Sequence, residues 1–368
     1  MTKNYHGGNL KEGARLYGLR EVELLDFSAN INPLGPSPQV WTALQKALPR
    51  IIHYPDPEAR ELKEVLASYL GVPAGQVVLG NGGAELIYLL SRFFRPGRVV
   101  LTAPTFGEYG GGAPGVEILP LNLAPERDFR LTLEQFAGSL KPGDLVFVGN
   151  PNNPTGVLTP RETVLELAQL AAAAGSQLVV DEAFMDFVEE SQSVVSLAGA
   201  HPNLIVVGSL TKIFALPGLR LGYLVAREEL VSQLEDLLPP WRVNTLAQAA
   251  GLVSLRDQEH LRRSREVVKE EREYLIEQLK DLGFRPFPGR ANFLLVSTHS
   301  VGVTGAKLQS FLGPRGVLIR LCHSFANLDD YYFRIAVRTR EENEKLLGLL
   351  EEALAASSSP AQGRRDGK

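Results

Sequence analysis

The chain has 368 residues, 44% hydrophobic and 22% charged, which is an ordinary globular composition with length for a sizeable core or two domains. The formal net charge of -4 and the lack of a long apolar run argue against a nucleic-acid-binding or membrane protein. The single cysteine, Cys322, allows no intrachain disulfide and no cysteine-rich metal site, so we expect a cytoplasmic protein without a metal. Residues 1–6 also lack the apolar core of a signal peptide.

Residues 1–40 are rich in Gly, Asn and Pro, a composition that is typical of turns rather than of long helices. The segment begins with His6-Gly7-Gly8-Asn9 and later carries Asn30 and Asn32 on either side of Ile31. Two interpretations stay open. The segment forms an arm on the surface, or it folds over a polar ligand.

From about residue 57, amphipathic stretches alternate with short apolar runs. We expect helices near 58–70, 86–94 and 160–174, and strands at 77–79, 98–101, 116–119, 145–148, 177–180, 204–207 and 222–226. This alternation favours a mainly parallel sheet with helices on both faces.

Four polar features directly follow predicted strands: the glycine loop at 80–85, Asn153, Asp181 and Lys212. In open parallel sheets, ligands bind at the carboxyl ends of the strands, so we expect these features to converge. The glycine loop stands between a strand and a helix, where free backbone N–H groups can bind a phosphate. It matches neither the P-loop nor the dinucleotide-binding pattern, and most glycine loops are only tight turns.

Lys212 lies at the end of a buried strand, and a desolvated amine loses its proton readily and attacks carbonyl groups. The hydroxyls of Ser209 and Thr211 and the cation of Arg220 could hold an anionic group beside that amine. This pattern predicts a lysine that binds a phosphorylated aldehyde, pyridoxal 5'-phosphate (PLP), covalently. The alternative is a lysine that leaves the strand for solvent.

Three further residues suit such a cofactor. Asp181 could keep the pyridine nitrogen of PLP protonated, although a helix cap is the commoner role of an Asp after a strand. Phe106 could stack on the ring or belong to the core. Asn153 could donate to the phenolic oxygen of the cofactor or form a turn.

The C-terminal part begins after Pro239-Pro240-Trp241. A long amphipathic helix repeats Leu261, Val268, Leu275 and Leu282 and ends at Gly283. Strands at 292–296, 317–320 and 332–337 and a last helix to about 354 predict a smaller α+β domain. We therefore expect an N-terminal arm at 1–40 that contributes to the site and to the small domain, a large cofactor-binding domain at 41–240, a small domain at 241–354 and a disordered tail at 355–368.

Four motifs follow one another in a familiar order: Asn150-Pro-Asn-Asn-Pro-Thr-Gly156, Asp181-Glu-Ala-Phe184, Ser209-Leu-Thr-Lys212 and Gly218-Leu-Arg220-Leu-Gly222. With them, the sequence resembles the fold type I PLP-dependent enzymes of the class I/II aminotransferase branch, over nearly the whole chain. The resemblance implies an α/β large domain, with a mainly parallel sheet of the seven-stranded type flanked by helices, and a smaller α+β C-terminal domain.

The resemblance also implies roles for individual residues. Lys212 would bind the cofactor aldehyde, Asp181 the pyridinium, Asn153 the phenolate, and Phe106 the ring face. Ser209, Arg220 and the N–H groups of Gly83 and Ala84 would hold the cofactor phosphate. Tyr54 would reach the cofactor phosphate of a neighbouring subunit, which implies a homodimer with shared sites. Arg334 would bind the α-carboxylate of a small phosphorylated amino-acid substrate. Asn153 would contact this substrate as well.

Two groups within this branch compete, the histidinol-phosphate aminotransferases and the L-threonine-O-3-phosphate decarboxylases of cobalamin biosynthesis. The segment from His6 to Asn9 and the segment 26–35 resemble the N-terminal signature of the decarboxylases. Arg338 stands where the aminotransferases usually have glycine, and Phe184 where they usually have a tyrosine. In the decarboxylase interpretation, the substrate phosphate is bound by His6, Asn30 and Arg320. Alternatively, His6 is a surface histidine, Asn30 forms a turn, and Arg320 is an exposed arginine at the end of a strand.

A third interpretation is a PLP-fold regulator that binds without turnover. Such regulators usually carry an added DNA-binding module, and the sequence has neither room for one before residue 26 nor a helix-turn-helix signal.

Overall fold

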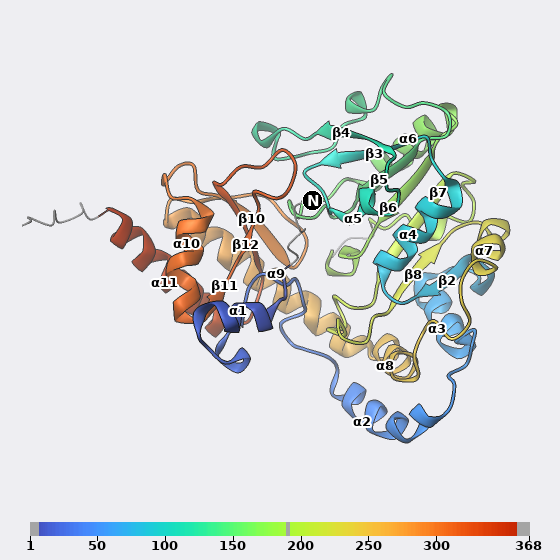
Figure 1. The fold of residues 1–368 in the computed structure, drawn as a ribbon, viewed down its shortest axis with the longest axis horizontal. Helices are drawn as coiled ribbons and strands as arrows, with labels where there is room; N and C mark the ends of the chain where they lie inside the picture. Colours follow the sequence, from blue (N-terminus) through green and yellow to red (C-terminus); the bar gives the residue numbers. More distant parts are fainter. Residues whose placement is uncertain (1–6, 189–191, 359–368) are drawn as a thin grey trace, which may run out of the picture.

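The computed structural model describes residues 7–188 and 192–358 (Figure 1). Its largest element is a seven-stranded sheet of order β2-β8-β7-β6-β5-β3-β4. The strands are β2 (Val77–Gly80), β3 (Arg98–Ala103), β4 (Glu117–Asn122), β5 (Leu145–Gly149), β6 (Gln177–Asp181), β7 (Leu204–Ser209) and β8 (Gly222–Val225). Only β8 runs antiparallel to its neighbours, so the mainly parallel sheet is confirmed.

Helices cover both faces of this sheet, and inner strands such as β5, β7 and β8 are therefore buried along their whole length, whereas the edge strand β4 is largely exposed. On one face, α4 (Gly83–Phe94) and α7 (Glu228–Glu235) pack against alternate strand residues such as Val207 and Leu224. On the other face, α3 (Arg60–Leu70), α6 (Arg161–Ala173) and α9 (Gln258–Asp281) cover residues such as Val180 and Val206.

The C-terminal part contains a four-stranded antiparallel sheet of order β12-β13-β10-β9. Its strands are β9 (Arg285–Pro286), β10 (Phe293–Ser297), β12 (Arg320–Leu321) and β13 (Tyr332–Ala336), and α10 (Gly305–Leu312) packs with α11 (Arg340–Ser358) beside them. Helix α11 runs four residues beyond the expected end at 354. Residues 359–368 of the expected tail lie outside the described residues.

The N-terminal segment contains a helix that its composition did not indicate. Helix α1 (Leu10–Tyr17) begins after Asn9, whose side chain accepts a 3.1 Å hydrogen bond from the amide of Glu12. It ends at Gly18, which has a φ of 68°. Strand β1 (Leu25–Asp26) then pairs in parallel with β11 (Val317–Leu318), so this segment packs on the C-terminal part.

Two helices connect the parts of the molecule (Figure 1). Helix α8 (Thr245–Arg256) follows the expected boundary at Trp241, yet it packs against α2 (Pro38–Ala47) and α3 on the side of the large sheet. Helix α9 then contacts the turn at Met185–Phe187 as well as β9 and β10, so it spans both parts.

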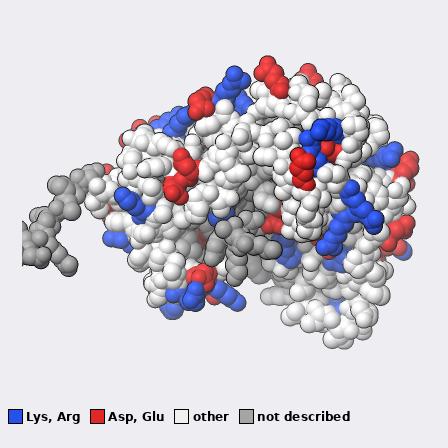
Figure 2. Space-filling view, turned by 45° about the horizontal axis from the view of Figure 1, so that its top comes forward, with Lys and Arg blue, Asp and Glu red and all other residues white. Residues whose placement is uncertain are grey.

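Lys, Arg, Asp and Glu side chains are interspersed over the face shown in Figure 2. None of the helices in the two described ranges combines the length and apolar character that a membrane span needs. Among the same residues, no group of three or more His, Cys, Asp or Glu side chains is arranged to hold a metal ion.

Candidate active site

A cavity of about 610 Å³ lies at the carboxyl ends of the large sheet's parallel strands and extends to the small antiparallel sheet. Eleven of the predicted site residues line it: Asn30, Gly83, Ala84, Phe106, Asn153, Asp181, Ser209, Lys212, Arg220, Arg320 and Arg334. The expected convergence of loops that follow separate strands is therefore present in the structure.

Lys212 follows β7 and lies half-buried in the cavity wall, not free in solvent. Burial, with the nearby charges of Arg334 and Arg220, lowers the pKa of its amine to about 8. The Nζ atom lies 6.0 Å from the centroid of the Phe184 ring. A sizeable fraction of Lys212 is therefore neutral near physiological pH and can attack an aldehyde.

Asp181 ends β6 and is held by two donors. The hydroxyl of Tyr109 donates to Oδ2 at 2.9 Å, and the amide of Ala183 donates to Oδ1 at 3.0 Å. Burial nevertheless raises the pKa of this carboxyl group. A cationic ring nitrogen beside it would favour the ionised form, so this carboxylate suits a pyridinium partner.

Tyr109 was not predicted as a site residue. Its fully buried ring stacks on Phe147 at 5.1 Å between centroids and meets Phe106 edge-on at 5.6 Å. The signal was present in the sequence, because Tyr109 follows the predicted site residue Phe106 by three residues. Tyr109 lies in the short helix α5 (Glu108–Gly111), and its amide donates to the carbonyl of Phe106 at 3.5 Å.

An anion cradle faces Lys212 at the beginning of α4. Gly82 precedes the helix with a φ of 91°, and a Cβ atom there would lie 2.4 Å from Nη2 of Arg220. Only glycine therefore allows this arginine to approach the helix, whose first N–H groups have no intrahelical acceptor. The hydroxyls of Ser209 and Thr211, 2.8 Å apart, complete the cradle.

These residues fit PLP. The cradle offers a cation, hydroxyls and a helix N-terminus to a phosphate group. The half-buried Lys212 lines the same cavity and is available to the aldehyde, and Asp181 offers a carboxylate for the ring nitrogen. Phe106 lines the same cavity, where a ring could stack on it.

Arg334 on β13 lines the same cavity as the cradle. Its Nη1 donates to Oδ1 of Asn153, and its Nη2 donates to the carbonyl of Ser28 at 2.8 Å. Its Nε is buried and has no hydrogen-bond partner among the described residues. Burial lowers the pKa of this guanidinium to about 10. The group can therefore exchange neutral partners for an anionic ligand.

A second cationic region is formed by Arg320 and its neighbours. Nη2 of Arg320 donates to Oγ of Ser324 at 3.0 Å, and Cζ lies 5.1 Å from the ring centroid of Phe325. Asn30 lines the same cavity, and its buried Oδ1 has no partner among the described residues. Ser324 and Phe325 were not predicted, because no local spacing links the loop at 322–328 to the cofactor motifs.

Two residues singled out in the sequence do not line the described part of the cavity. Tyr54 is 80% exposed and stacks on Trp241 at 4.6 Å between centroids. Arg338 donates to the carbonyl of Asp26 at 3.2 Å and to Glu342 at 2.7 Å, so it holds the N-terminal segment. His6, predicted to bind substrate, lies outside the described residues.

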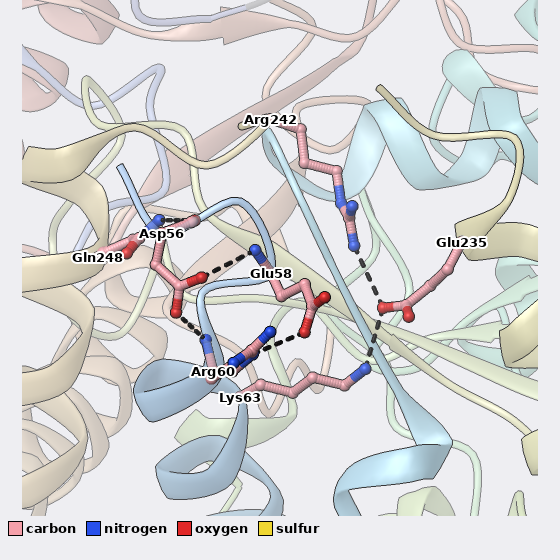
Figure 3. A network of polar contacts seen from close by, with 7 residues as sticks. All are labelled: Asp56, Glu58, Arg60, Lys63, Glu235, Arg242 and Gln248. Atoms are coloured by element: carbon pink, nitrogen blue, oxygen red, sulfur yellow. Dashed lines mark hydrogen bonds and ion pairs between the residues drawn. The ribbon is translucent and has the colours of Figure 1, made fainter. Parts of the chain in front are cut away.

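The segment that carries Tyr54 is fixed by polar contacts (Figure 3). Asp56 accepts hydrogen bonds from the amides of Glu58 and Arg60 at 3.1 and 2.9 Å, and Gln248 of α8 donates to its carbonyl at 2.9 Å. Nearby, Glu235 accepts from Lys63 at 2.9 Å and from Arg242 at 3.3 Å. The exposed Tyr54 ring thus belongs to a segment that hydrogen bonds hold in place.

Known proteins are similar to this chain in sequence and in fold. The profile of the family "Aminotransferase class I and II" matches residues 22–350. Threonine-phosphate decarboxylase of Salmonella typhimurium is 36% identical over 359 residues, which cover 96% of this chain and 98% of that protein. Histidinol-phosphate aminotransferase of Moorella thermoacetica is also 36% identical, over 355 residues that cover 95% of this chain and 90% of that protein.

Among solved structures, the histidinol-phosphate aminotransferase of Clostridium acetobutylicum superposes with a TM-score of 0.84 at 31% identity, over 90% of this chain and 100% of that one. The family match, the identities and the fold agree with the geometry of the cavity. The chain therefore belongs to the class I and II aminotransferase family of PLP-dependent enzymes.

Proposed function

We propose that the protein decarboxylates L-threonine O-3-phosphate to (R)-1-amino-2-propanol O-2-phosphate, a step of the aminopropanol arm of cobalamin biosynthesis. The alternative is transamination of histidinol phosphate or a related amine, because relatives of both kinds are 36% identical to this chain. Both reactions use a small phosphorylated substrate, so the choice between them depends on details of the cavity.

The observation that carries the proposal is the apolar ring of Phe184 beside Lys212. Phe184 is buried and packs edge-on against Phe293 at 4.9 Å between centroids. Aminotransferases of this branch usually have a tyrosine here that donates to the phenolic oxygen of the cofactor. Phenylalanine cannot donate, which favours the decarboxylase.

The N-terminal segment also supports the proposal. Gly7 and Asn30 share the wall of the cavity with Arg320, and the resemblance to the decarboxylase signature rests on this segment. Gly7 packs so closely on the backbone of Ser28 that a Cβ atom would lie 2.0 Å from its carbonyl oxygen. The signature glycine therefore fits a close backbone approach beside the proposed phosphate subsite.

When bound, PLP withdraws electrons from the bonds of the substrate's α-carbon. Arg334 would bind the α-carboxylate, and Arg320 with Asn30 would bind the phosphate. These two contacts would orient the substrate and so decide which bond of its α-carbon is broken. In the proposed reaction the bond to the carboxylate would break and CO₂ would leave, and the amine of Lys212, or water, would donate a proton to the α-carbon in its place. Asp181 would hold the proton on the ring nitrogen.

The proposal includes a homodimer. An exposed apolar surface surrounds Tyr54 and contains Leu48, Ile51, Ile52 and Trp241, which are 45–79% exposed. Contiguous exposed apolar side chains of this size are typical of interaction surfaces. A second copy bound here would bring Tyr54 to the cofactor phosphate of the partner subunit.

The test is CO₂ release from L-threonine O-3-phosphate, run beside transamination of histidinol phosphate with 2-oxoglutarate. We expect CO₂ release in the first assay, and its loss in Lys212→Ala. Transamination without CO₂ release would establish the alternative. A protein that binds PLP through Lys212 but turns over neither substrate would support the regulator instead.

A further inference from the structure

Asn327 connects a loop of the small sheet to the edge of the large sheet through two side-chain hydrogen bonds. Its Nδ2 donates to the carbonyl of Ala103 at 3.2 Å and to the carbonyl of Leu123 at 2.8 Å. Ala103 is the last residue of β3, and Leu123 directly follows β4. One side-chain amide thus uses its two N–H donors to join the ends of two neighbouring strands to the loop.

The backbone of the loop supports this contact. Asn327 has a φ of 67°, a left-handed conformation that asparagine tolerates better than most residues. Within the loop at 322–328, the amide of Phe325 donates to Cys322 at 2.9 Å, and the amide of Leu328 donates to Phe325 at 3.2 Å. Phe325 and Leu328 pack on an apolar cluster that includes Leu123.

The two elements that Asn327 joins carry different parts of the cavity wall. The loop at 322–328 carries Ser324 and Phe325, which together with Arg320 are here called the anion subsite. Ala103 lines the cavity together with Thr105 and Phe106, the residue expected to meet the cofactor ring. A shift of the loop would therefore change the distance between the anion subsite and the cofactor.

We propose that Asn327 is a positioning residue that fixes this distance, and that it thereby selects substrates by the number of bonds between the α-carbon and the phosphate group. The inference rests on the proposed function in that the substrate phosphate binds at Arg320. Asn327 itself touches neither cofactor nor substrate in this arrangement, because both of its N–H donors are engaged with carbonyl groups.

Two variants of the holoenzyme test the role. Asn327→Gly keeps the left-handed backbone accessible and removes the amide, whereas Asn327→Asp keeps the shape and replaces the donors with acceptors. Each is assayed with L-threonine O-3-phosphate and with O-phospho-L-homoserine, which is one CH₂ longer between the α-carbon and the phosphate. His323→Ala is the matched control, because His323 is exposed on the same loop and does not line the cavity.

We expect the wild-type enzyme to prefer the shorter substrate. Both Asn327 variants should reduce the ratio of the two kcat/KM values by about fivefold, the effect of a lost hydrogen bond, mainly through KM. His323→Ala should keep the wild-type ratio. An unchanged ratio in folded Asn327→Gly, or an equal loss on both substrates, would overturn the inference, since a purely structural role lowers both values alike.

A second measurement separates this inference from the proposed function. If the wild-type enzyme decarboxylates neither substrate, the proposed function fails, and binding of the same two phosphorylated amino acids to the holoenzyme is measured instead by titration calorimetry. The ratio of their two dissociation constants should change about fivefold in Asn327→Gly and keep the wild-type value in His323→Ala. An equal ratio in all three proteins would overturn the role of Asn327 independently of the reaction.

Discussion

The hydroxyl of Tyr109 donates a 2.9 Å hydrogen bond to Oδ2 of the half-buried Asp181, and the tyrosine itself is buried, where an isolated polar group is costly. Burial raises the pKa of the tyrosine and of the aspartate, so the phenol stays protonated and remains a donor. Tyr109 therefore orients the carboxylate that we expect to meet the cofactor's ring nitrogen.

Tyr109→Phe removes this donor and keeps the stack on Phe147. Hydrogen bonds to charged groups contribute about 1.5–3 kcal/mol, so we expect kcat/KM to fall by about 10- to 100-fold, with weaker PLP binding. Tyr88→Phe is a matched control, because it removes a 2.6 Å bond to Glu108 and Tyr88 does not line the cavity. If the two variants behave alike, Tyr109 has no special role.

Arg334→Lys keeps a positive charge but loses the planar fork that can bind a carboxylate through two nitrogens. We expect KM for the amino-acid substrate to rise at least about tenfold, because charge-assisted bonds of about 1.5–3 kcal/mol are lost. The absorbance of bound PLP should stay unchanged. The product amine lacks the carboxylate, so its inhibition constant should hardly change. Equal weakening of substrate and product would contradict the assignment of Arg334 to the carboxylate.

The lowered pKa of Lys212 predicts how the PLP-free protein captures its cofactor at different pH values. Only the neutral amine attacks the aldehyde, so the rate should increase with pH and level off above about pH 8. At pH 7 the neutral fraction exceeds that of an ordinary lysine by about two orders of magnitude. Stopped-flow absorbance measures this profile. A rate that continues to rise up to pH 10 would contradict the lowered pKa.

Arg334→Gln extends this test. Removal of its charge eliminates one of the causes that lower the pKa of Lys212, so the rate profile should level off at a higher pH. Arg98→Gln changes a charge paired with Asp144, outside the residues that line the cavity, and should leave the profile in place. Equal profiles in the two variants would show that the charge of Arg334 does not contribute to this pKa.

Most of the large sheet could be predicted because its strands are buried on both faces and appear as continuous apolar runs such as Leu145–Val148. The convergence of Asp181 and Lys212 followed from their places after parallel strands. Helix α1 was missed, because glycines and asparagines surround a helix of only 8 residues. Its stability comes from packing of Ala14 on Leu24 and Leu318, which local composition does not show.

The cavity could be predicted on its cofactor side and less well on its substrate side. Cofactor residues lie in motifs with fixed spacing, whereas Ser324 and Phe325 reach Arg320 through a loop that is held by Asn327 across a long-range contact. Arg338 was singled out as a mark of the reaction, yet it contacts Asp26 and Glu342 and does not line the cavity. Its contact with the N-terminal segment is to the carbonyl of Asp26, two residues before Ser28.

Asn30 and Asn32 offer a comparison of two buried asparagines in one segment. Oδ1 of Asn30 is buried and has no hydrogen-bond partner within residues 7–188 and 192–358. In contrast, Nδ2 of Asn32 donates to Ile213 and to Ser264 at 2.7 Å, and its Oδ1 accepts from Leu34 at 3.1 Å. The amide oxygen of Asn30 is therefore unsatisfied at the cavity wall, whereas the amide of Asn32 is hydrogen-bonded to the surrounding protein framework.

Replacement of each by leucine, which is similar in size, should therefore have opposite effects. Asn30→Leu removes an unpaired buried amide oxygen, so the free energy of unfolding should stay constant or rise by about 1 kcal/mol, while turnover of the phosphorylated substrate falls at least about tenfold. Asn32→Leu leaves buried partners unsatisfied and should lower the free energy of unfolding by about 2–4 kcal/mol. Denaturant titration and kinetics on both variants test this. If Asn30→Leu destabilises the protein as much as Asn32→Leu, then Asn30 belongs to the framework and not to the phosphate subsite.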